Sequence, residues 1–206
     1  MPRGRALGYT MVLPDDDKYS TTRNQLLDQL AYSLGGRAAE ELIFHDPSTG
    51  SSNDIEKATA LARAMVTQYG MTEAIGAIKL GSDSSEPFMG RDFGHQRDYS
   101  ESVAAIVDAE IRKLIENAHL EAYELLVENR ATLDAMVLAL LEKETLNKEE
   151  IAKIFKKIKK RENRPAWTGS ALRIPSRVPP VDVPARIEST PEEVKKRTTR
   201  TKKSEE

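Results

Sequence analysis

The 206-residue sequence contains no cysteine, and only 5% of its residues are aromatic. The lack of cysteine excludes disulfide bonds, thiolate nucleophiles and cysteine-based zinc or redox motifs. No run of about 18 apolar residues is available to cross a bilayer, and no basic segment precedes an apolar one as in secretory signals. Positive and negative charges nearly balance, with a net charge of -2, so no overall field attracts nucleic acid or anionic lipid. We therefore expect a soluble chain.

Most of the sequence shows the residue patterns of helices. Apolar residues recur at steps of three and four positions, the spacing of an amphipathic helix, in five stretches. They predict helices over residues 20–42, 53–70, 100–126, 130–141 and 147–158. Gly35 and Gly36 interrupt the first stretch, but the apolar stripe resumes in phase after them, so we favour close packing of a neighbour there over a bend. The fold class is predicted to be mainly α.

Two segments depart from the helical pattern. Residues 5–13 alternate apolar side chains and predict a short β strand, which Pro14 ends. A lone strand needs a partner, so we expect that chain upstream of Met1 is missing. Six of the ten prolines lie at or beyond residue 165, in a stretch without any helical stripe. We therefore predict a folded domain over residues 1–161 and a disordered tail over residues 162–206.

The sequence contains no complete catalytic constellation. Its three histidines, His45, His95 and His119, are too far apart to form a local metal pair, and no phosphate-binding loop or nucleophile motif is present. Asp54 is the residue of greatest interest because it stands where the second helix begins. The free N–H groups of a first helical turn favour a carboxylate, so a first-turn acid is the plain interpretation. A zinc ligand is the alternative.

Several segments of the sequence resemble one protein family. They are PRGRALGYT (2–10), GGRAAEE (35–41), TGSSNDIEKAT (49–59), YGM (69–71), EPFMGRD (86–92), DYS (98–100) and LLEKETL (140–146). In order and spacing they are similar to the peptidase domain of FtsH, the membrane-anchored ATP-dependent zinc metalloprotease. The resemblance covers about residues 1–160 and does not extend to the tail.

The resemblance implies a site and a cofactor. In that family two histidines and a glutamate of an H-E-x-x-H helix precede the RGRALGY strand, and the aspartate of the N-D segment is the third zinc ligand. This aspartate corresponds to Asp54. The histidine pair lies outside the sequence, so we expect an incomplete Zn²⁺ site, no catalytic residue within this chain, and little activity from the chain alone. ATP is implied only for an ATPase module outside it.

The resemblance also implies partners and a location. The intact protein would form a homohexamer, degrade unfolded or membrane proteins, and lie on the cytoplasmic side of the membrane, anchored by transmembrane helices outside this sequence. The alternative is a non-hydrolytic module in which the helices over residues 100–160 stack subunits. The basic residues from 153 to 161 mostly lie on the predicted solvent-exposed face of the last helix, opposite its apolar stripe. We therefore expect no nucleic-acid partner.

Overall fold

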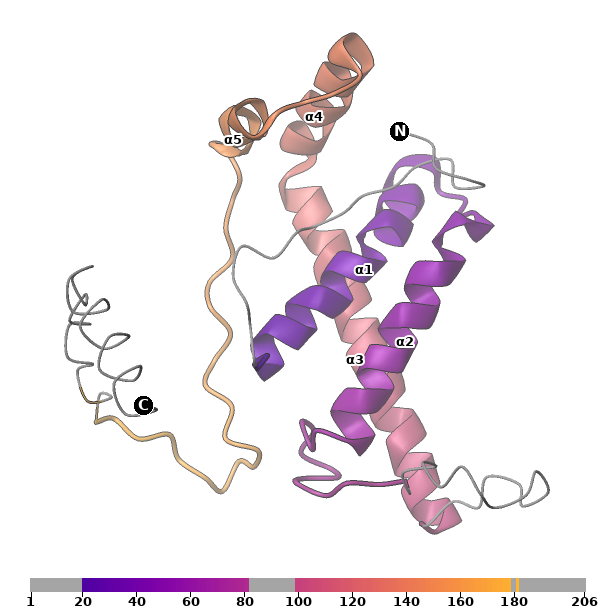
Figure 1. Cartoon of the computed structure of the whole chain (residues 1–206), viewed down its shortest axis with the longest axis vertical. Helices are drawn as coiled ribbons and strands as arrows, with labels where there is room; N and C mark the ends of the chain where they lie inside the picture. The colour runs from indigo at the N-terminus through magenta and orange to yellow at the C-terminus, as the bar shows by residue number, and fades with distance from the viewer. Residues whose placement is uncertain (1–19, 82–98, 179–180, 182–206) are drawn as a thin grey trace, which may run out of the picture. The chain divides into compact units, whose positions relative to one another are not determined.

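The computed structural model describes residues 20–81, 99–178 and 181 (Figure 1). This part of the chain is mainly helical, which confirms the predicted fold class, and it contains no strand. The predicted strand over residues 5–13 lies outside the described residues. The elements are α1 (Arg23–Phe44), η1 (Thr49–Ser51), α2 (Ser52–Thr67), α3 (Glu101–Glu128), α4 (Arg130–Lys143) and α5 (Lys148–Phe155).

Polar caps explain where the helices begin. The Thr22 side chain accepts a hydrogen bond from the Gln25 amide, and the Gln25 side chain accepts one from the Thr22 amide, a capping box before α1. Asn147 and Glu150 repeat this arrangement before α5. Ser100 caps α3. These side chains satisfy N–H groups that have no partner inside a helix, so the starts of these helices are set locally.

The sequence places the end of the second helix at Gly70, but α2 ends at Thr67 with Gln68 as its C-cap. Gly70 lies in the turn that follows the helix. Its φ of 59° lies in the left-handed region, and the amide of Met71 donates to the carbonyl of Met65 at 2.9 Å. A Cβ at this position would stand 2.6 Å from the carbonyl oxygen of Gly76. Glycine is therefore required here both by the backbone conformation and by the close approach of the following turn.

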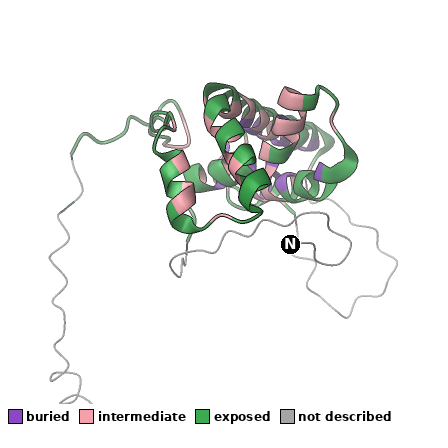
Figure 2. Cartoon of the chain, turned by 90° about the horizontal axis from the view of Figure 1, so that it is seen from above, coloured by how far each residue is buried: buried purple, intermediate pink, exposed green. Residues whose placement is uncertain are grey.

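Helices α1, α2 and α3 pack together and enclose the core (Figure 2). The largest fully buried side chains come from all three helices and are Leu30, Met65, Val66 and Val107. Alanines occupy many of the remaining core positions, for example Ala38, Ala58 and Ala118, which allows the helix backbones to approach closely. Neither α4 nor α5 buries any residue, so the core belongs to the first three long helices.

The packing expected at Gly35 and Gly36 is not made by the described residues. Helix α1 runs through both glycines without interruption, and, apart from the adjacent residues and the backbone of α1 itself, no described atom lies within 4 Å of where a Cβ would stand on either. The prediction of a close neighbour is therefore wrong for this part of the chain. The apolar stripe keeps its phase because the hydrogen-bonded helix tolerates glycine at a cost of about 1 kcal/mol each.

The chain divides into two compact units, Met1–Arg173 and Ile174–Glu206. In the second unit the described residues form no regular secondary structure, and the Val178 amide donates to the Ser176 hydroxyl at 3.2 Å. The predicted domain boundary after residue 161 stays a prediction. In the first unit, residues 164–171 make contacts with the helices that are described below. Across the described ranges, no helix has the length and apolar character needed to span a membrane.

Candidate metal centre at the start of α2

Asp54 lies in the first turn of α2 with its side chain exposed. The short helix η1 leads directly into α2, so the segment TGSSNDI forms one continuous entry to the helix. Backbone N–H groups at this end carry the positive pole of the helix dipole and favour an ionised carboxylate. Because Asp54 is exposed, its carboxylate has an oxygen available as a ligand.

Glu40 of α1 holds the chain that leads to Asp54. Its two carboxylate oxygens accept hydrogen bonds from the amide and from the hydroxyl of Ser48, both at 2.8 Å. The Ser48 hydroxyl in turn accepts from the Gly50 amide at 3.1 Å. The backbone and side-chain hydrogen bonds from Ser48, with a further contribution from the charge of Arg37, lower the pKa of Glu40. A carboxylate on α1 thus fixes where η1 and α2 begin.

Acidification is expected to loosen the turn that Glu40 holds. A carboxyl group whose pKa is lower in the folded state than in the unfolded state stabilises the folded state. This stabilisation is fully present above the unfolded pKa, ordinarily 4.5 for a glutamate, and is lost as the pH falls through the folded pKa. The protection factors of the Ser48 and Gly50 amides, measured by hydrogen exchange between roughly pH 5 and pH 3, should therefore decline. Glu40→Gln should remove this decline. Identical pH profiles in the two proteins would contradict the assignment.

Ser51, which immediately precedes α2, is buried at 7% exposure. Its hydroxyl oxygen has no hydrogen-bond partner among the described residues. Buried hydroxyls in folded proteins nearly always have a partner. The entry to α2 therefore combines an exposed carboxylate with a buried hydroxyl whose hydrogen-bonding capacity the described residues leave unused.

Neither of the two described histidines completes a metal site with Asp54. His45 ends α1 in the left-handed conformation, with Nδ1 3.1 Å from the Glu41 carbonyl oxygen. His119 of α3 has a buried Nε2 that lies 3.0 Å from Glu41 Oε2, without hydrogen-bond geometry. His95 lies outside the described residues.

The described donor set does not fit a zinc ion by itself. No group of three or more histidine, aspartate or glutamate side chains able to hold a metal occurs within residues 20–81, 99–178 and 181. A catalytic zinc needs three protein ligands and an open position. Asp54 can supply one, so no chemical step through zinc follows from these residues alone. Its role as a zinc ligand stays a prediction.

Glu41 makes the ion pair that its neighbourhood in the sequence suggests. Its Oε1 lies 2.6 Å from Nε of Arg37, one helical turn earlier. Because Oε2 of the same carboxylate approaches His119, Glu41 links α1 to α3. These contacts give Glu41 a structural role and assign no chemistry to it.

Sequence reasoning missed the contacts of Arg161 and Arg164. Arg161 binds Glu124 and Glu128, and Arg164 binds Glu121, all three glutamates on α3. A signal was available, because these glutamates follow one another at steps of three and four and so share one face of a helix. The sequence does not show which cations meet that face, because the partners lie 33 to 43 positions away.

Comparisons with known proteins agree with the resemblance. The profile of Peptidase family M41 matches residues 1–154. An "ATP-dependent zinc metalloprotease FtsH" from Cutibacterium acnes is 60% identical over 184 residues, which are 89% of this chain and 26% of that protein. A Mycobacterium bovis protein of the same name is 46% identical over 187 residues, 91% of this chain and 25% of that protein. One from Thermoanaerobacter, "FtsH 1", is 52% identical over 155 residues. The sequence spans about a quarter of the length of these relatives.

Proposed function

Because the chain belongs to peptidase family M41, we propose that it is the C-terminal peptidase portion of an ATP-dependent zinc metalloendopeptidase. Asp54 is the zinc ligand that this chain contributes. The observation that supports this role is its exposed place in the first turn of α2, inside the segment TGSSNDI. The remaining ligands and the general base come from an H-E-x-x-H helix outside this sequence.

The proposed substrates are unfolded or membrane proteins, and ATP is used by a module outside this chain. The zinc would polarise the scissile carbonyl and lower the pKa of its bound water when it is present. Asp54 holds one coordination position, while Glu40 and Ser48 hold the turn that carries it. We place the intact protein on the cytoplasmic side of a membrane, anchored by helices outside this sequence.

We also propose that the intact protein is a homohexamer. Support comes from α4, which buries no residue within the described chain and exposes Leu138 at 67% and Leu141 at 76%. Exposed leucines on one helix are typical of a surface that contacts another subunit. Subunit contact by these helices is compatible with hydrolysis elsewhere in the protein, so the two roles belong to one proposal.

A chimera tests both parts of the proposal. In this chimera, the portion of the Cutibacterium acnes FtsH that matches this chain is replaced by this chain. The relative then supplies the upstream modules. We expect ATP-dependent hydrolysis of casein and a hexamer of the same size as the parent by sedimentation. The isolated 206-residue chain is the negative control. A chimera that hydrolyses ATP as a hexamer but leaves casein intact would refute the peptidase role, and a monomeric chimera would refute the assembly role.

A further inference from the structure

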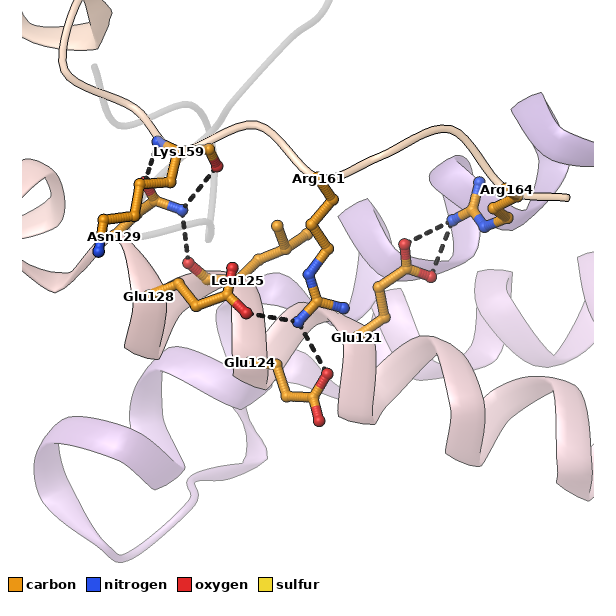
Figure 3. Close-up of polar contacts among 8 residues, drawn as sticks. All are labelled: Glu121, Glu124, Leu125, Glu128, Asn129, Lys159, Arg161 and Arg164. Atoms are coloured by element: carbon orange, nitrogen blue, oxygen red, sulfur yellow. Dashed lines mark hydrogen bonds and ion pairs between the residues drawn. The ribbon is translucent and has the colours of Figure 1, made fainter.

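An extended segment after α5 lies along the surface of α3 and reaches α1 (Figure 3). We call residues 159–171 the strap. It has no helix or strand, and it contributes no side chain to the hydrophobic core. Its contacts with the helices are therefore separate from the packing that holds α1, α2 and α3 together.

Asn129 anchors the beginning of the strap. Its side-chain oxygen accepts a hydrogen bond from the Lys159 amide at 2.7 Å, and its side-chain nitrogen donates to the carbonyls of Lys159 and Leu125 (Figure 3). Since Asn129 stands between α3 and α4, this double hydrogen bond ties the strap to the end of α3.

Two arginines then bind the acidic face of α3. Arg161 donates to Glu124 at 2.8 Å and to Glu128 at 2.9 Å. Arg164 donates to both carboxylate oxygens of Glu121, at 2.7 and 2.8 Å (Figure 3). The same guanidinium reaches Asp28 of α1 at 2.5 Å, so Arg164 bridges two helices.

The charges of α3 explain why the strap is bound there. Three glutamates stand in its last turns, where a helix dipole favours cations, and its last turn contains no basic residue. Like charges three or four positions apart also repel one another. Arg161 and Arg164 supply the missing positive charge. Hydrogen bonds with Glu128 and Glu124 raise the pKa of Arg161, so its charge is retained at all ordinary pH.

The far end of the strap meets α1 and the turn after α2. The guanidinium of Arg23 lies 4.5 Å from the centre of the Trp167 ring, a cation–π contact. The Ala171 amide donates to Glu73 at 2.9 Å. Arg23 also donates to the Met71 carbonyl, so the ring covers a side chain that already joins α1 to the turn.

We propose that the strap is a detachable latch that fastens α3 to α1 by ion pairs and is released by ionic strength while the three-helix core remains folded. The physical basis is that the ion pairs of the two arginines are partly exposed to solvent: the side chain of Asp28 is 67% exposed and that of Glu124 is 47% exposed. Salt screens ion pairs that are exposed to solvent. The screening length falls from about 10 Å at 0.1 M salt to about 3 Å at 1 M. Core burial of apolar side chains has no such salt dependence.

Trp167 is the only tryptophan in the chain, so its fluorescence reports on the strap alone. It is 39% exposed when the strap is bound. Raising NaCl from roughly 0.05 to 1 M should increase its quenching by neutral acrylamide about twofold and shift its emission to longer wavelength, as exposure becomes complete. The circular dichroism at 222 nm should stay constant over the same range.

Arg164→Gln should show the high-salt quenching already at low salt, since it removes contacts to both α1 and α3. Arg177→Gln removes the same charge from a residue outside the strap and should behave like the parent chain. Glu121→Gln tests the latch from the helix side in case Arg164→Gln does not fold. Quenching that is independent of salt, or unchanged in both Arg164→Gln and Glu121→Gln, would overturn the proposal. So would loss of helical signal together with Trp167 exposure.

Discussion

Replacing Asp54 by alanine in the chimera is expected to reduce casein hydrolysis at least about a hundredfold. Loss of groups that only orient a metal ligand typically costs 10–100-fold, and loss of a ligand itself should cost more. Zinc bound per subunit, measured by mass spectrometry, should fall in parallel. ATP hydrolysis should be unchanged, because the ATPase module lies outside the altered segment.

Controls separate a ligand from a helix-stabilising acid. A first-turn aspartate stabilises its helix by only about 0.3–1 kcal/mol, so the melting temperature of Asp54→Ala should change little. Asp108→Ala removes another exposed carboxylate, from α3, and should retain full activity and zinc. Asp54→Asn keeps a polar first-turn side chain but loses the charge, and should resemble Asp54→Ala. Full zinc content and hydrolysis in Asp54→Ala would show that Asp54 is not a ligand.

Replacing Leu30 by alanine is expected to destabilise the chain by about 2–5 kcal/mol. Leu30 has 0% exposure and is the largest fully buried side chain that α1 contributes to the core. Truncation removes its apolar burial and leaves a cavity between α1 and its neighbours, because close-packed helices relax only partly. Domains of this size are stable by only about 5–15 kcal/mol, so the loss is a large fraction of the total.

Urea unfolding followed at 222 nm measures this loss. The midpoint should fall with little change in slope, since the surface exposed on unfolding remains nearly the same. Leu138→Ala removes the same atoms from a residue of α4 that is 67% exposed, and it should change stability by less than about 0.5 kcal/mol. Equal effects of the two substitutions would show that the core does not lie where α1, α2 and α3 meet.

Local chemistry explains the features that the sequence predicts correctly. Ser100 and Asn147 start their helices through hydrogen bonds that span three residues, and Gly70 takes the left-handed conformation in the turn that follows α2. Such signals need only near neighbours in the chain. The family resemblance likewise depends on short segments that follow one another in a fixed order along the sequence. Both could be found before the packing was known, and so could Asp54 as the candidate ligand.

The sequence by itself determined the helical class, most helix ends, the family and the position of Asp54 at a helix start. Only the tertiary structure decided which charges meet. It showed that Glu40 holds the turn before Asp54, that Glu41 approaches His119, and that Arg164 joins α1 to α3. The physical reason is the separation along the chain of the residues that interact. A cap or a periodic stripe is a short-range property of the chain, whereas an ion pair between residues 43 or 136 positions apart exists only after the helices have packed.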